Sequence, residues 1–203
     1  LARIERAATL TEALAWPESA WRQAGLDDAA IRWLRQPNVH RIEADMAWVR
    51  HAGHRLLWPG EPDYPVLLAE ALEAPPPLFA DGDPTLLHRP CIAVVGARRA
   101  TPGGLENARW FARTLAAAGY TIVSGLALGV DTAAHRAALD TGGATVAVLG
   151  TGVDVPYPLG NVELAHGIRQ SGAVLSEFPP GTTARPESFP RRNRVISGLC
   201  RAT

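Results

Sequence analysis

Apolar residues in the second half of the chain fall into short runs separated by longer stretches with a helical repeat. The runs cover residues 92–95, 121–123, 145–149 and 173–175, and a glycine or serine follows each of them. The stretches 104–118, 131–140 and 161–170 repeat their apolar positions with the period of a helix. Strands that are apolar on both faces and alternate with helices are typical of a parallel sheet covered on both sides. The pattern predicts a doubly wound parallel sheet, an α/β Rossmann-like fold.

The first sixty residues follow another pattern and predict a separate helical module. Apolar positions recur at helical spacing over residues 1–38, and residues 43–52 are expected to form a further helix that ends at Gly53. Five of the six tryptophans lie in this part: Trp16, Trp21, Trp33, Trp48 and Trp58. Their helical spacing favours the packed core of a small module over the alternative of a base-stacking platform.

A proline-rich stretch, residues 59–90, joins the two parts. It is predicted to be a structured connector that lies on the second domain, because its apolar side chains need burial. We therefore expect a helical module over 1–60 and a Rossmann-like domain over 61–203. No closing element follows residue 199, although a further strand is expected there, so we expect the C-terminal part of this domain to be missing.

Composition narrows the class of protein. The chain has 203 residues, 20 acidic and 20 basic side chains, and 47% hydrophobic residues, which argues against intrinsic disorder. No apolar run approaches the ~18 residues of a membrane span, and the charged N-terminal residues do not resemble a signal peptide. Two cysteines, Cys91 and Cys200, form neither a disulfide framework nor a metal motif, so a reduced, cytoplasmic setting is expected.

Every basic side chain is arginine, whose planar fork suits phosphate groups. In the predicted sheet, ligands bind beyond the carboxyl ends of the strands, where Gly96, Gly125, Gly150 and Gly152 let the backbone approach a ligand closely. The first turn, Gly96-Ala97-Arg98-Arg99, matches neither the dinucleotide fingerprint nor the P-loop. An arginine there favours an open phosphate or a nucleic-acid backbone, against the alternative of a simple surface arginine.

The second and third turns offer further polar groups. Ser124, Asp131 and His135 include the residue types of a hydrolytic triad, but the chain lacks the nucleophile elbow. Asp131 is instead expected to cap the following helix and to pair with His135, bracing the loop. Tyr157 could stack on a base, although burial in the core is the commoner role of a single aromatic residue.

The last candidate segment is basic. Residues 185–201 hold five arginines against Glu187 alone, and Arg191, Arg192, Asn193 and Arg194 are expected at a helix N-terminus after Pro190. Such a cluster suits bidentate contacts with phosphates, whereas a solvated charged turn is the alternative.

Five motifs in order resemble the DNA-processing protein A family (DprA/Smf). They are VVGAR at 94–98, SGLALGVDTAAH at 124–135, GTGVDVPYP at 150–158, LSE at 175–177 and FPRRNRVIS at 189–197. The residues around Tyr64-Pro65 and 76–83 resemble the lead-in of this family, and the N-terminal helices resemble its small SAM-like module. Ala97 stands where family members often carry a small hydroxylated residue.

The resemblance implies a binding protein of natural transformation and no catalytic activity. Such proteins bind and protect incoming single-stranded DNA and help to load the RecA recombinase, with no metal or other cofactor and no membrane. It implies a homodimer for the full-length protein, through a region that this chain lacks. Carried over to this sequence, the DNA-binding residues are Gly96, Ala97, Arg98, Arg99, Ser124, Gly125, Gly129, Asp131, Arg191, Arg192, Asn193 and Arg194.

One enzyme remains as the alternative. The sheet also resembles LOG-type phosphoribohydrolases, which cleave a base from a nucleoside monophosphate, but their P-G-G-x-G-T-x-x-E motif does not occur in this sequence. A dinucleotide-dependent oxidoreductase is disfavoured because the G-x-G-x-x-G fingerprint does not occur either.

Overall fold

The computed structural model describes residues 10–203, and the chain divides into two compact units between Ala47 and Trp48. The first unit is helical, as expected, with α1 (Leu10–Leu14), α2 (Glu18–Gln23), α3 (Asp28–Arg35) and most of α4 (Val39–Val49). Trp21 and Ile31 are buried in it, and the Trp21 indole donates to the carbonyl oxygen of Ala13 at 2.7 Å. Trp33 is 53% exposed, so the tryptophans of this unit do not share one environment.

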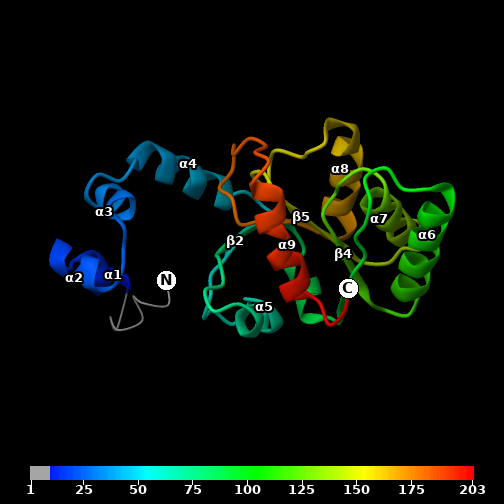
Figure 1. Cartoon of the computed structure of the whole chain (residues 1–203), viewed down its shortest axis with the longest axis horizontal. Helices are drawn as coiled ribbons and strands as arrows, with labels where there is room; N and C mark the ends of the chain where they lie inside the picture. The colour runs from blue at the N-terminus through cyan, green and yellow to red at the C-terminus, as the bar shows by residue number, and fades with distance from the viewer. Residues whose placement is uncertain (1–9) are drawn as a thin grey trace. The chain divides into compact units, whose positions relative to one another are not determined.

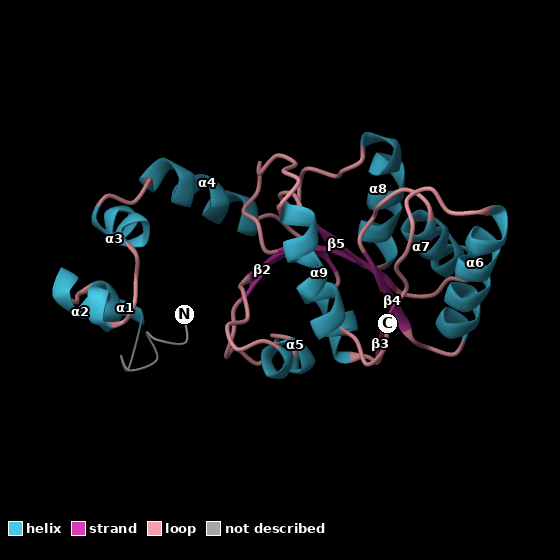
Figure 2. Ribbon diagram, viewed as in Figure 1, coloured by secondary structure: helices cyan, strands magenta, loops and turns pink. Residues whose placement is uncertain are grey.

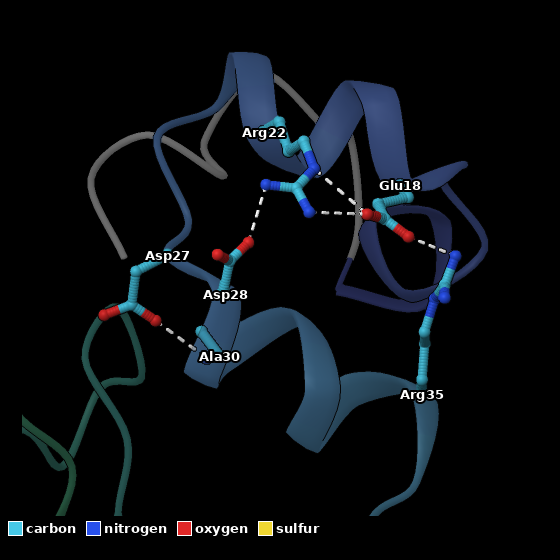
Figure 3. Close-up of polar contacts among 6 residues, drawn as sticks. All are labelled: Glu18, Arg22, Asp27, Asp28, Ala30 and Arg35. Carbon is cyan, nitrogen blue, oxygen red and sulfur yellow. Dashed lines mark hydrogen bonds and ion pairs between the residues drawn. The ribbon is translucent and has the colours of Figure 1, made fainter.

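Surface ion pairs join two helices of the first unit, α2 and α3 (Figure 3). Glu18 accepts from both Arg22 and Arg35, and Arg22 also reaches Asp28 at 2.7 Å. Asp27 caps α3 by accepting from the backbone N–H of Ala30 at 2.8 Å. Exposed pairs of this kind each contribute little to stability, whereas a side-chain cap contributes about 1 kcal/mol.

The second unit is built on one sheet. Within the described residues the sheet has six strands in the order β1-β2-β6-β5-β4-β3. The strands β3 (Cys91–Ala93), β4 (Thr121–Ser124), β5 (Thr145–Leu149) and β6 (Ala173–Ser176) are parallel. Two antiparallel strands, β1 (His54–Leu57) and β2 (Leu78–Gly82), extend the sheet at β6. The predicted Rossmann-like α/β fold is thus confirmed, and β1 and β2 are additions that the sequence pattern did not predict.

Helices cover both faces of this sheet (Figures 1 and 2). On one face lie α6 (Pro102–Ala117), α7 (Val130–Asp140) and α8 (Val162–Ser171), each of which links consecutive parallel strands. On the other face lie α9 (Ser188–Leu199) and α5 (Val66–Ala71), which pack against each other. Two short 3₁₀ helices, η1 (Pro84–His88) and η2 (Leu159–Asn161), complete the regular structure.

Alternation along the strands divides the core between the two faces. Val146 and Val148 of β5 pack toward α9, whereas Ala147 and Leu149 pack toward α8. Both sets are fully or almost fully buried, as expected for a parallel strand covered on both sides. The smaller cluster between α6, α7 and Ile122 is built largely of alanine, so these two helices approach each other closely.

The proline-rich connector lies on the second unit, as expected, and its last part enters the sheet. Tyr64 is buried and donates its hydroxyl to the carbonyl oxygen of Pro76 at 2.7 Å. Burial raises the pKa of this hydroxyl above its usual value. Beyond these residues, Phe79 and Ala80 pair with Ser176 and Leu175 of β6.

The chain returns to the first parallel strand after α9. Ala202 pairs with Ile92 in parallel, on the side of β3 that faces away from β4. The backbone N–H groups of Arg201 and Ala93 complete this pairing with the carbonyl oxygens of Cys91 and Ala202. The chain therefore continues from β3 to β4, β5 and β6 on one side and returns after α9 to the other side of β3. The direction of the connections reverses at β3, so the carboxyl end of β3 is the switch point of the sheet. Within residues 10–203, no helix has both the length and the apolar character of a membrane span.

Candidate functional site

A cleft of about 580 Å³ lies at this switch point. It is lined by the turn after β3, with Gly96 and Arg98, by Ala127 of the loop before α7, by Asp131 of α7 itself, by α9, and by Thr203. A smaller hollow of about 90 Å³ continues it toward Leu128 and Tyr157. The two share Arg98, Ala127, Phe189 and Arg192, and together they form the edge cleft. Open α/β sheets bind their ligands at such a point.

Asp131 organises the loop that forms one wall of the edge cleft. Its buried carboxylate accepts from the backbone N–H groups of Gly125 at 3.1 Å and Ala127 at 3.4 Å. Burial raises the pKa of this carboxyl, while those two N–H groups and the charge of Arg192 act in the opposite direction. The prediction that Asp131 caps α7 is wrong, because Gly129 is the capping residue and Asp131 lies in the first turn.

Gly129 is required by its backbone conformation. Its φ is +82°, and a Cβ atom there would lie 2.2 Å from the carbonyl oxygen of Ala97. The glycine therefore lets the loop before α7 pack directly on the turn that carries Arg98. A side chain at this position would separate the two walls of the edge cleft.

Arg192 lies beneath the edge cleft, where its side chain is almost fully buried. Its Nη1 donates to the carbonyl oxygens of Gly125, at 2.8 Å, and of Val148, and its Nε donates to the Asn193 side chain at 3.1 Å. Burial lowers the pKa of Arg192 to about 10, the charge of Asp131 raises it, and that of Arg98 lowers it. This guanidinium therefore joins α9 to the ends of β4 and β5.

Arg98 differs from Arg192 in being free to bind a ligand. It is exposed, and within residues 10–203 its guanidinium makes no hydrogen bond or ion pair. Its guanidinium carbon lies 5.5 Å from the centroid of the Phe189 ring, and the centroid of the Tyr157 ring lies 5.4 Å from that of Phe189. A cation held over an aromatic ring keeps its hydrogen-bond donors available at the edge of the stack.

The other two arginines of α9 share one carboxylate. Glu177, whose side chain is 1% exposed, accepts from Arg194 at 2.5 Å and from Arg191 at 3.2 Å. The Arg194 side chain is 33% exposed and lines the edge cleft, whereas the Arg191 side chain is 61% exposed and does not line it. Glu177 therefore neutralises one of the two positive charges that Arg191 and Arg194 carry.

The predicted site residues fall into distinct places. The edge cleft is lined by seven of them: Gly96, Arg98, Gly125, Asp131, Arg192, Asn193 and Arg194. Ser124 is buried at the end of β4 and donates to the carbonyl oxygen of Val94 at 2.7 Å. Ala97 and Gly129 form the contact between the two walls, whereas Arg99 is exposed and lines neither hollow.

Two predictions about local geometry are wrong. The arginines of α9 do not lie at a helix N-terminus, because the helix begins at Ser188 and Pro190 is within its first turn. Asp131 does not pair with His135, whose Nδ1 instead lies 2.8 Å from the Thr145 hydroxyl. Because that hydroxyl donates to the carbonyl oxygen of Ile122, the ring donates to it, and Nε2 is left buried without a partner. Burial, assisted by the charge of Arg192, lowers the pKa of His135 to about 3.

Sequence reasoning missed Phe189 and Glu177 as parts of the site. Phe189 lines both hollows and holds the aromatic contacts of Arg98. Glu177 directly follows β6, at the same carboxyl edge of the sheet as the arginines. This position could have indicated that its carboxylate forms ion pairs with them. Among the residues that the structure describes, no group of His, Cys, Asp or Glu side chains could hold a metal ion.

Comparison with known proteins gives consistent results. Residues 55–203 match the family model of DNA recombination-mediator protein A. The chain is 40% identical over 173 residues to Protein Smf of Escherichia coli, covering 85% of this chain and 42% of that protein. It is 47% identical over 138 residues to DNA processing protein DprA of Streptococcus pneumoniae, covering 68% and 49%. The chain thus spans less than half of the length of these two curated relatives.

Two solved structures are similar as well. The X-ray structure of DNA processing protein A from Streptococcus pneumoniae superposes with a TM-score of 0.79 at 35% identity, covering 90% of this chain and 63% of that one. The structure of DNA processing protein A from Helicobacter pylori gives a TM-score of 0.66 at 34% identity, covering 74% and 67%.

Proposed function

Because this chain belongs to the DNA recombination-mediator protein A family, we propose that it binds single-stranded DNA in the edge cleft. The observation that carries this proposal is the exposed guanidinium of Arg98, which makes no hydrogen bond or ion pair within residues 10–203 and lies over Phe189 at the switch point of the sheet. The Helicobacter pylori protein, similar in fold, has a single-stranded DNA binding mode. A phosphate group suits the free fork of Arg98, and an unstacked base suits the neighbouring aromatic rings.

Each part of the cleft has a role in this proposal. Arg98 binds a backbone phosphate, and Arg194 adds a second, partly neutralised charge. Tyr157, 43% exposed beside Phe189, offers a face on which a base can stack. Arg192 and Asp131 hold the walls in place from below and act as positioning residues. In this proposal the protein binds the DNA and breaks none of its bonds.

Membership of the family also supports a proposal about the role of the whole protein in the cell. In the whole protein, we expect the bound strand to be incoming DNA in natural transformation, which is protected and handed to the RecA recombinase. Assembly into a homodimer belongs to the same expectation. Incubation of the chain with AMP tests the phosphoribohydrolase alternative, because released adenine would show catalysis at the same cleft.

Replacing Arg98 by alanine is expected to weaken binding of single-stranded oligonucleotides about tenfold, equally for all base sequences. The reason is that a phosphate contact carries no base information. Fluorescence anisotropy at several salt concentrations measures it, and the slope of log K against log salt should fall by about 0.7 for the lost contact. Arg113→Ala removes an exposed charge of α6 that lines neither hollow of the edge cleft and is the matched control. Equal affinities of the two variants would contradict the assignment.

Replacing Tyr157 by leucine is expected to weaken binding about fivefold and to leave the salt slope unchanged. Leucine keeps an apolar side chain but removes the ring face, and stacking contributes about 1–3 kcal/mol per base. The same anisotropy titration measures both quantities, with Tyr157→Phe as the variant that retains the ring. A Tyr157→Leu protein that binds as tightly as Tyr157→Phe would show that no base stacks here.

A further inference from the structure

A second groove lies beside the edge cleft. It has a volume of about 410 Å³ and runs between α6, α7 and η2. Its lining includes Arg109 of α6, Arg136 of α7 and the small residues Thr132, Ala133 and Ala137. Both arginines are exposed.

The groove adjoins the edge cleft at Leu128. This residue is 50% exposed and lines both the smaller hollow of the edge cleft and the second groove. From there the groove follows α7, since its lining positions Gly129, Thr132, Arg136 and Asp140 recur at the spacing of one helix face. Eleven residues of helix rise by about 16 Å, so the groove extends well beyond the edge cleft.

The charges of the groove are open to a ligand. Within residues 10–203, neither Arg109 nor Arg136 makes a hydrogen bond or an ion pair. Asp140 is the one carboxylate among the residues that line the groove, and it makes no ion pair with Arg136 although the two are four positions apart. The two guanidinium groups therefore leave a net positive charge on a concave surface.

We propose that this α6–α7 groove binds the phosphodiester backbone of the same single strand where it leaves the edge cleft past Leu128. Arginine forks on two neighbouring helices suit successive phosphates of a flexible strand, and the half-exposed Leu128 gives the sugar and base an apolar surface where the two hollows adjoin. The net positive charge and the exposure of both arginines favour a backbone contact over a buried mononucleotide. This inference rests on the proposed function, because the strand must first occupy the edge cleft.

The test compares oligothymidines of increasing length, from about 5 to about 30 nucleotides, a range that starts near the smallest sites of single-strand binders. The double variant Arg109→Ala/Arg136→Ala is expected to bind the shortest oligonucleotides as tightly as the native chain. For the longest ones we expect affinity about tenfold lower and a salt slope smaller by about 1.4, because each single-strand phosphate contact contributes about 0.7. Arg89→Ala/Arg113→Ala removes two exposed arginines outside both the groove and the edge cleft and is the matched control.

The outcomes separate the two proposals. Loss of affinity confined to long oligonucleotides supports the groove. Equal binding of the double variant and its control at all lengths, with Arg98→Ala still defective, overturns the groove and leaves the edge cleft in place. If the double variant weakens short and long oligonucleotides equally, the groove is not an extension of the cleft. Failure of the native chain to bind any single strand would overturn both proposals.

Discussion

Arg192→Met is expected to lower the free energy of unfolding by about 3–5 kcal/mol, the usual cost of removing one partner from a buried charge pair. The substitution removes the guanidinium that joins α9 to the carbonyl oxygens of Gly125 and Val148. Both carbonyl oxygens lie in buried residues. In addition, Asp131 loses the positive charge that favours its ionised form.

The measurement is equilibrium denaturant unfolding followed by circular dichroism. Arg192→Lys is the informative companion, because lysine retains the charge but cannot reach two carbonyl oxygens with a planar fork. If Arg192 holds the walls of the cleft, the lysine variant should lose most of the same stability. Arg191→Met, at an exposed position one residue away, should change the free energy of unfolding by less than about 0.5 kcal/mol. A stable Arg192→Met protein with weakened DNA binding would instead make Arg192 a phosphate contact.

Acid is expected to destabilise the native chain more steeply than a His135→Gln variant. The folded state holds His135 neutral, with a pKa of about 3, whereas an unfolded histidine has a pKa near 6.5. Between these two values the unfolded chain binds the extra proton. The contribution of His135 is therefore fully present above pH ~6.5 and is lost as the pH falls, by about 1.4 kcal/mol per pH unit.

Denaturant unfolding at pH 7, 6 and 5 measures the difference between the two proteins. By pH 5 the native chain should have lost about 2 kcal/mol more than His135→Gln, and by pH 3 roughly 5 kcal/mol. The raised pKa of Asp131 changes stability in the opposite direction at low pH, but it does so in both proteins. His166→Gln, which changes an exposed histidine, should retain the native dependence on pH. Parallel curves for native and His135→Gln would show that His135 is accessible to protons when folded.

The parallel strands of the second unit could be predicted from the sequence, because each strand is a short run of residues with its own apolar pattern. The predicted strand 145–149 coincides with β5, because Val, Ala and Leu there are buried on both faces and no polar residue interrupts them. The strands β1 and β2 were missed for the opposite reason. They are antiparallel additions with half-exposed positions, and three prolines directly precede β2, so the short pattern resembled a connector.

The edge of the sheet at which the candidate arginines lie was predicted, but the surroundings of each arginine were not. Sequence reasoning treated Arg191, Arg192 and Arg194 as equivalent members of a basic cluster. Helical geometry separates them, because Arg192 shares a face with the buried Val195, Ile196 and Leu199. That signal was in the sequence. The ion pairs of Glu177 were harder to predict from the sequence. They depend on how the end of β6 packs against α9, and these two elements are separated along the chain.

The loop before α7 directs its N–H groups inward, to Asp131, and this has a consequence for selectivity. Phosphate-binding loops usually surround an anion with several converging backbone donors, and a single nucleotide then binds tightly. Here those two donors are satisfied by the protein, so affinity depends on a few separate side-chain contacts, each of them weak. Contacts of this kind reinforce one another only when one ligand reaches several of them at once. We therefore expect a free nucleotide or an inorganic anion to compete poorly at this edge and a polymer to be retained, with discrimination by the length of the ligand before discrimination by its bases.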